Sequence, residues 1–291
     1  MYVIETQNLS FTYGLNTPIE KTAVDNVSIR IKQGELLGVI GHTGSGKSTL
    51  VQMLNGLITP TSGKVLLKGK DIFENKKDLR SVRFQVGMVF QYPEYQLFEE
   101  TVYKDIAFGP SNMGQTGNEL EASVLKAADF AGLDRELLSK SPFDLSGGEK
   151  RRAAIAGVIA MDPDVLILDE PTAGLDPMGR EALLDRITDY HKKRNNTVIL
   201  VSHSMEDVAR ICDRVLVMNS SKMFMLDDTK KVFSHGDELE KMGLRVPQIT
   251  KIMSALRDKG YDISDGILTV DQAFSELSAI LEKGEKRCSE M

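Results

Sequence analysis

One short segment constrains the fold of this chain more than any other. Between an apolar run at residues 36–40 and a stretch with helical spacing at residues 48–54, the sequence reads Gly41-His42-Thr43-Gly44-Ser45-Gly46-Lys47-Ser48-Thr49. Its first eight residues fit the pattern G-x-x-x-x-G-K-[ST], in which a strand, a glycine-rich turn and a helix wrap backbone N–H groups around phosphates. We therefore expect a phosphate-binding loop, with Lys47 reaching the β- and γ-phosphates of a nucleotide and the Ser48 hydroxyl ligating Mg²⁺.

Two carboxylates follow a second apolar run. Residues 165–168 read Val-Leu-Ile-Leu, and Asp169 and Glu170 come directly after them. Because strand residues alternate in direction, the two side chains should point in different directions. Asp169 is expected to hold the Mg²⁺ shell, and Glu170 to orient and polarise an attacking water. An apolar strand that ends in Asp-Glu is common by chance, so this pair is informative only together with the phosphate-binding loop.

Strand-like and helical stretches alternate along residues 1–240. Residues 27–31 read as a half-buried strand, and residues 198–201 form another apolar run. This alternation predicts an α/β fold with a mostly parallel sheet covered on both faces, and ligands at the carboxyl ends of its strands. Between about residues 92 and 160 the pattern becomes mainly helical. We interpret that segment as a helical subdomain inserted in the sheet domain.

Residues 241–291 have a different character and predict a small helical C-terminal extension. Pro247 starts one helix that stops at Gly260, and Thr269 with Gln272 gives a capping-box pattern for a second helix that ends at Gly284. The two helices carry the apolar residues Ile249, Ile252, Met253, Leu256, Phe274, Leu277 and Leu281. Two such helices cannot form a core alone. They must pack either on their own domain or on a second chain, where they would help to hold a dimer together.

Charge and hydropathy exclude several classes of protein. The 291 residues include 36 basic and 42 acidic side chains, a formal net charge of −6, which gives no bulk reason to bind nucleic acid. No run approaches the ~20 apolar residues of a membrane span, and the N-terminus lacks the pattern of a signal peptide. Cys212 and Cys288 have no metal-ligand spacing and are expected to be reduced thiols in a cytosolic protein.

A further motif introduces a family resemblance. The segment Leu145-Ser146-Gly147-Gly148-Glu149 resembles the LSGGQ signature that defines the ABC ATPases, with Glu149 in place of the usual glutamine. The amides of Ser146, Gly147 and Gly148 would open a helix and form a second anion site. In the family this site closes on ATP held by the opposite subunit. The substitution at Glu149 is expected to matter little, because the phosphate-facing groups belong to the serine and the two glycines.

The resemblance covers nearly all of residues 1–235 and assigns further positions. Gln91 resembles the Q-loop glutamine that senses Mg²⁺ and the γ-phosphate, and His203 resembles the switch histidine that contacts the γ-phosphate. Asp176 resembles the D-loop residue that communicates across the dimer. Tyr13 resembles the aromatic residue that stacks on adenine, although Phe11 or Tyr13 could equally be a core aromatic. The implied fold is a P-loop NTPase core with an antiparallel β subdomain and a helical signature subdomain. The resemblance also implies ATP and Mg²⁺ as ligands. The implied catalytic residues are Lys47, Gln91, Glu170 and His203.

A narrower resemblance involves the segment after Gln91. Residues 91–102 read Gln-Tyr-Pro-Glu-Tyr-Gln-Leu-Phe-Glu-Glu-Thr-Val and, with residues 105–110, look like the ATPase subunits of energy-coupling factor transporters, of the second of their two types. Those transporters import vitamins or transition-metal ions. The resemblance implies a second ATPase subunit, identical or related, and a transmembrane coupling subunit that links the pair to a substrate-binding membrane subunit. It also implies a peripheral position on the cytoplasmic face of the cell membrane.

Other functions remain open at this level. One alternative is the ATPase of another ABC importer, and a second is a soluble ABC ATPase such as an iron–sulfur assembly factor, which the segment after Gln91 disfavours. Repair proteins of the class carry coiled coils or zinc insertions, and translation factors usually carry two cassettes; neither feature is present here. A non-catalytic regulatory subunit is disfavoured because both Glu170 and His203 are present.

Overall fold

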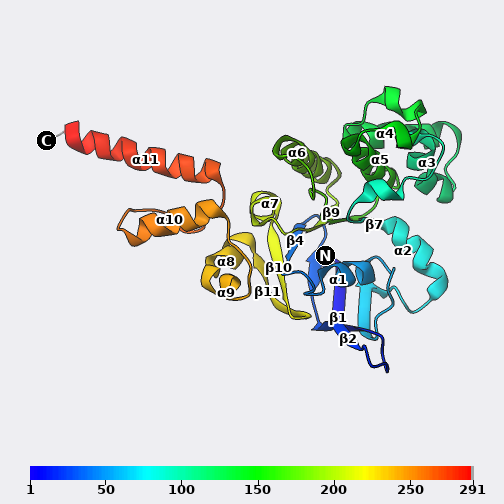
Figure 1. Cartoon of the computed structure of the whole chain (residues 1–291), viewed down its shortest axis with the longest axis horizontal. Helices are drawn as coiled ribbons and strands as arrows, with labels where there is room; N and C mark the ends of the chain where they lie inside the picture. Colours follow the sequence, from blue (N-terminus) through cyan, green and yellow to red (C-terminus); the bar gives the residue numbers. More distant parts are fainter. Residues whose placement is uncertain (290–291) are drawn as a thin grey trace.

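The six-stranded sheet of this chain places the phosphate-binding loop at the carboxyl end of its strand β4. In the computed structural model, which describes residues 1–289, the strand order is β11-β10-β4-β9-β8-β7, and all neighbours are parallel except β10 and β11 (Figure 1). The predicted mostly parallel sheet is confirmed. The strands are β4 (Leu36–Ile40), β7 (Val86–Val89), β8 (Val165–Asp169), β9 (Thr197–Val201), β10 (Arg214–Asn219) and β11 (Lys222–Asp228).

Both faces of this sheet are covered, as the continuous apolar runs predict. Along β9, Val198 and Leu200 pack into one hydrophobic cluster, while Ile199 and Val201 pack into another on the opposite face. Because successive side chains of a strand point to opposite faces, β9 contributes to a hydrophobic core on each face of the sheet. The covering helices of the sheet domain are α1 (Lys47–Leu54), α2 (Leu79–Gln85), α6 (Pro177–Arg194), α7 (Met205–Ile211), α8 (Thr229–Ser234) and α9 (Gly236–Lys241).

A second sheet of five strands forms the predicted antiparallel β subdomain. Its path is β2-β1-β5-β6, with β3 paired to β1. The strands are β1 (Tyr2–Tyr13), β2 (Lys21–Val27), β3 (Arg30–Lys32), β5 (Ser62–Leu67) and β6 (Lys70–Asp71). The strand expected over residues 27–31 is divided at residues 28–29, so that prediction is wrong. The Thr6 hydroxyl donates to the Val27 carbonyl at 2.9 Å and accepts from the Ile29 N–H at 3.0 Å, which satisfies the backbone where the pairing changes.

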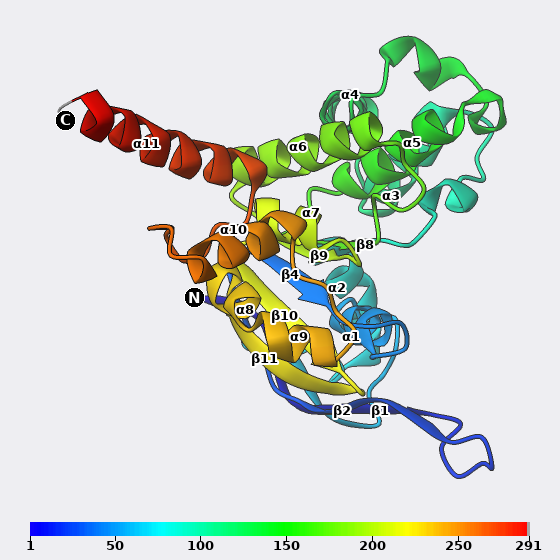
Figure 2. The same ribbon diagram turned by 60° about the vertical axis from the view of Figure 1, so that its left-hand side comes forward.

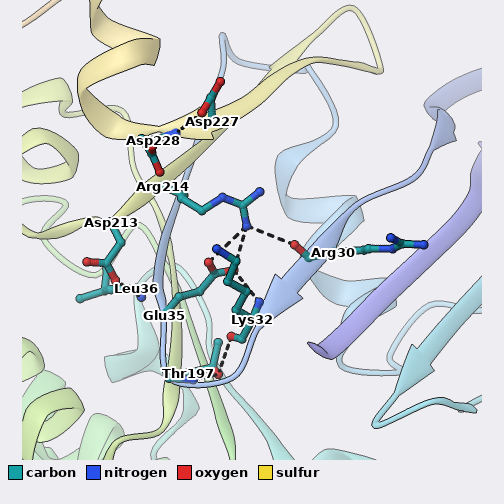
Figure 3. Close-up of polar contacts among 10 residues, drawn as sticks. Arg30, Lys32, Glu35, Leu36, Thr197, Asp213, Arg214, Asp227 and Asp228 are labelled. Carbon is teal, nitrogen blue, oxygen red and sulfur yellow. Dashed lines mark hydrogen bonds and ion pairs between the residues drawn. The ribbon is translucent and has the colours of Figure 1, made fainter. Parts of the chain in front are cut away.

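A buried ion pair joins the two sheets at the amino end of β4 (Figure 3). Arg214 on β10 donates from Nη1 to Oε2 of Glu35 at 3.2 Å, and the same nitrogen donates to the carbonyl oxygen of Arg30 at 3.3 Å. The backbone N–H of Lys32 donates to Oε1 of Glu35 at 2.7 Å. Both charged side chains are largely buried, so removing either partner would leave an uncompensated charge inside the protein.

The segment from residue 92 to residue 160, described throughout, contains helices and no strand. Its α-helices are α3 (Val102–Asn112), α4 (Gly117–Ala131) and α5 (Gly147–Ile159), with short 3-10 turns between them. They stand together beside the sheet domain, upper right in Figure 1. Small buried side chains, Ala127, Ala128, Ala153 and Ala156, allow the helices to pack closely.

The tail forms two helices with a small core of their own, so the expectation that they could not form one alone is wrong. These are α10 (Gln248–Asp258) and α11 (Val270–Ser289), and α11 projects from the body in both views (Figures 1 and 2). The predicted capping box is confirmed: the Gln272 N–H donates to the Thr269 hydroxyl, and the Thr269 N–H donates to Oε1 of Gln272, both at 3.3 Å. The predicted end at Gly284 is wrong, because an interior glycine costs a helix only ~1 kcal/mol.

The apolar face predicted for the tail divides into two parts. Met253 is buried together with Ile263, Ile267 and Ala273, and Ile249, Leu256 and Leu277 pack against them. Other side chains of the tail point into solvent, with exposed fractions of 54% for Ile252, 70% for Val270, 72% for Phe274 and 69% for Leu281. Leu244, Val246 and Leu268 belong to the main core. The domain boundary near residue 240 stays a prediction.

Candidate functional site

The ammonium group of Lys47 lies inside the curve of the glycine-rich loop. Its Nζ donates to the carbonyl oxygens of Gly41 at 2.8 Å and His42 at 3.1 Å, and the residue is only 6% exposed. Burial lowers the pKa of Lys47, and the nearby carboxylates of Glu170 and Asp169 oppose that effect. A buried cation beside two carboxylates, at the start of α1, is suited to bind a strongly anionic group.

The glycines of the loop are required by its backbone and by its close packing. Gly46 has φ +102 and Gly44 has φ +80, in the left-handed region that favours glycine. A Cβ on Gly46 would collide with the carbonyl oxygen of Ala23, whereas one on Gly44 would meet nothing within 4 Å. The loop is therefore closely packed at Gly46 and open at Gly44. The fully buried Ser45 hydroxyl has no hydrogen-bond partner among the described residues, as expected of a group that a phosphate would satisfy.

Ser48 and Asp169 come together under the loop, and the two fit a hydrated Mg²⁺ ion. Burial raises the pKa of Asp169, and the nearby Ser48 hydroxyl and the charge of Lys47 oppose that effect. Oδ1 of Asp169 is buried without a hydrogen-bond partner. Within residues 1–289 no three His, Cys, Asp or Glu residues gather as a metal site. A cation here would take its other ligands from phosphate and water, as Mg²⁺ commonly does.

The third predicted metal ligand, Gln91, is not brought into contact with these two groups. It follows β7, whose Val89 pairs with Leu168 of β8, so it lies at the sheet edge that carries Asp169 and Glu170. Its side chain is exposed, and no hydrogen bond joins it to any residue in the described part of the chain. Its role as a Mg²⁺ ligand stays a prediction.

Glu170 faces His203 from the end of β8. It follows the last residue of the strand, Asp169, and its φ of +53 takes the backbone out of the extended conformation. The backbone N–H of His203 donates to Oε2 of Glu170 at 3.3 Å, and Nε2 of the ring lies 3.3 Å from Oε1. Burial raises the pKa of Glu170 to about 6. Burial and the charge of Lys47 lower the pKa of His203. A carboxylate with a pKa in this range can accept a proton near neutral pH.

The signature segment starts α5 with a capping box. Ser146 donates to Oε2 of Glu149 from its hydroxyl at 2.6 Å and from its backbone N–H at 2.8 Å, and these bonds lower the pKa of Glu149. A Cβ on Gly147 would meet nothing within 4 Å, so this helix start is open. The negatively charged Glu149 carboxylate therefore lies directly beside the Ser146 hydroxyl, which was expected to face a phosphate. Ser146 makes no hydrogen bond to the phosphate-binding loop among the described residues.

Two more predicted positions have clear surroundings. Asp176 caps α6, because its Oδ1 accepts the N–H of Gly179 at 2.7 Å. The Tyr13 hydroxyl lies 3.1 Å from Oγ1 of Thr49 on α1, and its ring is 45% exposed. Phe11 meets that ring edge-on at 4.7 Å between centroids and packs against the core. Of the two aromatics, Tyr13 is the accessible one beside the loop.

Sequence reasoning missed two groups that support this site. Asp207 on α7 accepts from the Thr172 hydroxyl at 3.0 Å and from Nε of Arg180 at 2.7 Å, which ties the turn after Glu170 to the helix after His203. Arg151 on α5 also bonds to the turn after Glu170. Neither residue belongs to a local pattern, so no signal in the linear sequence would have found them.

Comparison with known proteins supplies the family. The family model described as ABC transporter matches residues 24–173, and a model described as AAA domain, putative AbiEii toxin, type IV TA system matches residues 141–207. The energy-coupling factor transporter ATP-binding protein EcfA2 of Clostridium tetani is 51% identical over 286 residues, 98% of this chain and 99% of that protein. The protein of the same name from Clostridium perfringens is 53% identical over 279 residues, 96% of this chain and 98% of that protein.

Solved structures of similar fold belong to the same family of transporter ATPases. The cbiO1 protein of Clostridium perfringens, described as part of the ABC transporter complex cbiONQ, gives a TM-score of 0.74 at 37% identity, over 87% of this chain and 99% of that one. MJ0796, described as a bacterial ABC transporter cassette and solved as a dimer, gives 0.71 at 26% identity, over 78% and 98%. The predictions of an ABC-type ATP hydrolase and of a likeness to the second energy-coupling factor type are confirmed. The chain belongs to the ABC transporter ATPases, in the group of energy-coupling factor transporter ATP-binding proteins.

Proposed function

We propose that this chain hydrolyses ATP within a nucleotide-bridged dimer and thereby drives an energy-coupling factor importer of vitamins or transition-metal ions. The observation that carries the proposal is the buried Glu170 carboxylate, which lies against His203 and close enough to Lys47 for their charges to interact. A base, a polar ring and a phosphate-binding cation thus share one edge of the sheet.

The residues of this site divide the work. The backbone of residues 41–46 with Lys47, Ser48 and Thr49 holds the phosphates, and Tyr13 stacks on the adenine. Mg²⁺, held by Ser48 and Asp169 and sensed by Gln91, would neutralise charge on the phosphate oxygens. Glu170 orients a water for in-line attack on the γ-phosphate and takes up its proton, and His203 contacts the γ-phosphate. Positioning and electrostatics supply most of the rate enhancement.

A second ATPase subunit would complete each site. The open helix start at Gly147 and Gly148 makes no contact with the phosphate-binding loop of its own chain, which supports its use by the ATP of a partner. Asp176 would communicate across that interface, where the neighbouring Met178 side chain is 83% exposed. The exposed apolar strip of the tail, defined as Val270, Phe274 and Leu281, is the surface that we propose holds the two chains together between ATP cycles.

A membrane partner would dock on the segment after Gln91. That segment and α3 expose four aromatic side chains, in which Phe98 stacks edge-on against Phe108 at 5.0 Å and Tyr92 lies 6.3 Å from Tyr95. Clustered exposed aromatics are typical of protein interaction sites. We infer that helices of a transmembrane coupling subunit, itself joined to a substrate-binding subunit, bind there. Within the described residues no helix is long and apolar enough to cross a bilayer. We propose a peripheral position on the cytoplasmic face, as for the subunit of a membrane transporter.

Affinity purification of the full chain from native membranes tests this proposal. We expect a second ATPase and at least one integral membrane protein to copurify. Tyr95→Asp should lose the membrane protein, because it places a charge in the aromatic cluster. Tyr261→Asp, at a 54% exposed tyrosine of the tail, is the matched control and should retain it. Absence of any membrane protein with the parent chain would contradict the importer assignment.

A further inference from the structure

One buried guanidinium group connects three segments of this chain. Arg151 lies on the signature helix α5, five residues after Ser146, and is only 5% exposed. Its Nε and Nη2 donate to the two carboxylate oxygens of Glu94, at 3.2 and 2.9 Å. Its Nη1 donates to the carbonyl oxygens of Pro171 at 3.2 Å and Ala173 at 2.6 Å. The planar guanidinium group can donate to the carboxylate and to the two carbonyl oxygens at the same time, which the ammonium group of a lysine cannot do in this geometry.

Glu94 belongs to the 3-10 turn η2 (Pro93–Gln96), which follows Gln91. The carboxylate points inward, with its side chain only 17% exposed. Burial raises the pKa of Glu94, but the hydrogen bond from Arg151, a backbone hydrogen bond and the charge of Arg151 together leave the pKa below its usual value. The pair is therefore ionised at neutral pH. The aromatic side chains around Glu94 are exposed, whereas the Glu94 carboxylate contacts Arg151 of the same chain.

The two carbonyl groups belong to the turn that carries Glu170. With φ of +53, Glu170 adopts a left-handed backbone conformation that costs energy for any residue except glycine. The surroundings must hold it there. The Glu170 N–H donates to the Val201 carbonyl at 3.0 Å, and the Ala173 N–H donates to the Glu170 carbonyl at 3.1 Å. Arg151 is the side chain that holds this turn from the α5 side.

We propose that Arg151 is a positioning residue for Glu170, and that its hold depends on Glu94, so that the position of η2 sets the rate of hydrolysis. This inference rests on the proposed role of Glu170. Arg151 makes no hydrogen bond to the phosphate-binding loop, so the binding of ATP does not require it. A change in the placement of η2, such as docking of a partner beside it, would reach Glu170 through this one group.

The first test separates binding from turnover. Arg151→Lys keeps the charge but loses the fork, and we expect kcat to fall by about 10- to 100-fold, the range that a misplacement of ~1 Å can cause. The KM for ATP and the nucleotide affinity of the monomer should change less than about twofold, because binding groups are untouched. Arg135→Lys is the matched control. It alters an exposed pair in the same subdomain, in which Arg135 also contacts both oxygens of an aspartate, Asp129, and kcat should be unchanged.

The second test asks whether Arg151 acts through Glu170. In a Glu170→Gln background, Arg151→Lys should lower the residual single-turnover rate no further, since the group that it positions is already lost. A loss by the same factor in both backgrounds would overturn the proposal. A parent-like rate of the single variant Glu170→Gln would instead refute the role of Glu170 itself, which distinguishes the two failures.

The third test concerns Glu94 and does not require Arg151 to be changed. Glu94→Gln weakens only the carboxylate side of the contact and should lower kcat with KM unchanged, by a smaller factor than Arg151→Lys. The double variant should be no slower than Arg151→Lys alone. Thermal unfolding of each variant reports whether the fold is kept, and Glu94→Gln decides the question if Arg151→Lys does not fold. An unchanged kcat in Glu94→Gln would overturn the dependence on η2.

Discussion

The ring of His203 and the carboxylate of Glu170 lie against each other, with Nε2 and Oε1 3.3 Å apart. Burial raises the pKa of the acid and lowers that of the imidazole. The pair therefore carries one negative charge at neutral pH, on the carboxylate. A water bound between this carboxylate and a γ-phosphate would meet a base that is already ionised and already oriented.

The pH dependence of hydrolysis should report this carboxylate. Because Glu170 has a pKa of about 6, its basic form is lost as the pH falls, and kcat/KM should drop about tenfold per pH unit below that value. The measurement is steady-state hydrolysis between pH 5 and pH 8. The Glu170→Gln variant, measured alongside, should lack this acid limb. A limb of the same midpoint in both proteins would assign it to another group.

Glu170→Gln should also abolish most of the activity at neutral pH. The amide keeps the shape but cannot accept a proton, so hydrolysis should fall ~10²–10⁴-fold, the usual contribution of a positioned base. ATP binding should survive, and an ATP-stabilised dimer should accumulate in size-exclusion chromatography. Glu181→Gln, on the exposed side of α6, is a suitable control. Parent-like turnover in Glu170→Gln would rule out the assigned role.

Two substitutions should separate the halves of the shared site. Lys47→Ala removes the buried cation and should weaken nucleotide binding by an isolated chain, measured by calorimetry. Ser146→Arg should leave that binding intact while preventing ATP-dependent dimerisation and hydrolysis. Lys64→Ala, at an exposed lysine of β5, provides the control. Equal loss of monomer binding in Lys47→Ala and Ser146→Arg would mean that no site is shared between chains.

Glu149→Gln should favour the ATP-bound dimer. The glutamine oxygen can still accept the Ser146 N–H, but the negative charge at the start of α5 is removed. We expect ATP-dependent dimerisation to tighten about fivefold, as expected from removing one unit charge ~4 Å from another in water. Sedimentation in the Glu170→Gln background gives the measurement. Glu119→Gln, in the first turn of α4, should have no effect. Weaker dimerisation of Glu149→Gln would show that the carboxylate supports closure.

Phe274→Glu should weaken pairing of two chains in the absence of nucleotide. It places a charge in the exposed apolar strip without touching the core of the tail, whereas deletion from residue 246 would remove Val246 and Leu268 from the main core. Association is measured by sedimentation velocity. If the chain does not pair with itself, the related ATPase is added. Ala279→Glu, on an exposed position of the same helix, is the control. Equal association of both variants with the parent would leave the tail as local packing.

Much of the fold could be predicted because the signals are local. The phosphate-binding loop, the apolar runs of β8 and β9 and the Thr269 capping box each lie within a few consecutive residues. The site residues at the strand ends follow from the parallel order of the sheet. What could not be predicted depends on distant partners: Arg151 and Glu94 are 57 residues apart, and Thr172 and Asp207 are 35 apart.

The tail shows the same limit of the sequence signal. Helical periodicity marks its apolar positions, but it does not decide which of them the protein itself covers. Met253 is buried, and the adjacent Ile252 is 54% exposed, because the chain after Gly260 returns over only one side of α10. The signature motif identified the segment around Glu149 correctly. The hydrogen bond from the Ser146 hydroxyl to the Glu149 carboxylate could not be predicted, because it depends on side-chain geometry.

The ion pair between Arg214 and Glu35 has a consequence for how this ATPase moves. Since Arg214 also contacts the backbone of β3, the parallel sheet and the antiparallel sheet are joined at the amino end of β4, opposite the end that carries the glycine-rich loop. We therefore expect the two sheets to turn as one rigid frame during the cycle. If the chain drives a membrane partner as proposed, we expect the moving part to be the block of α3, α4 and α5, which would rotate against this frame.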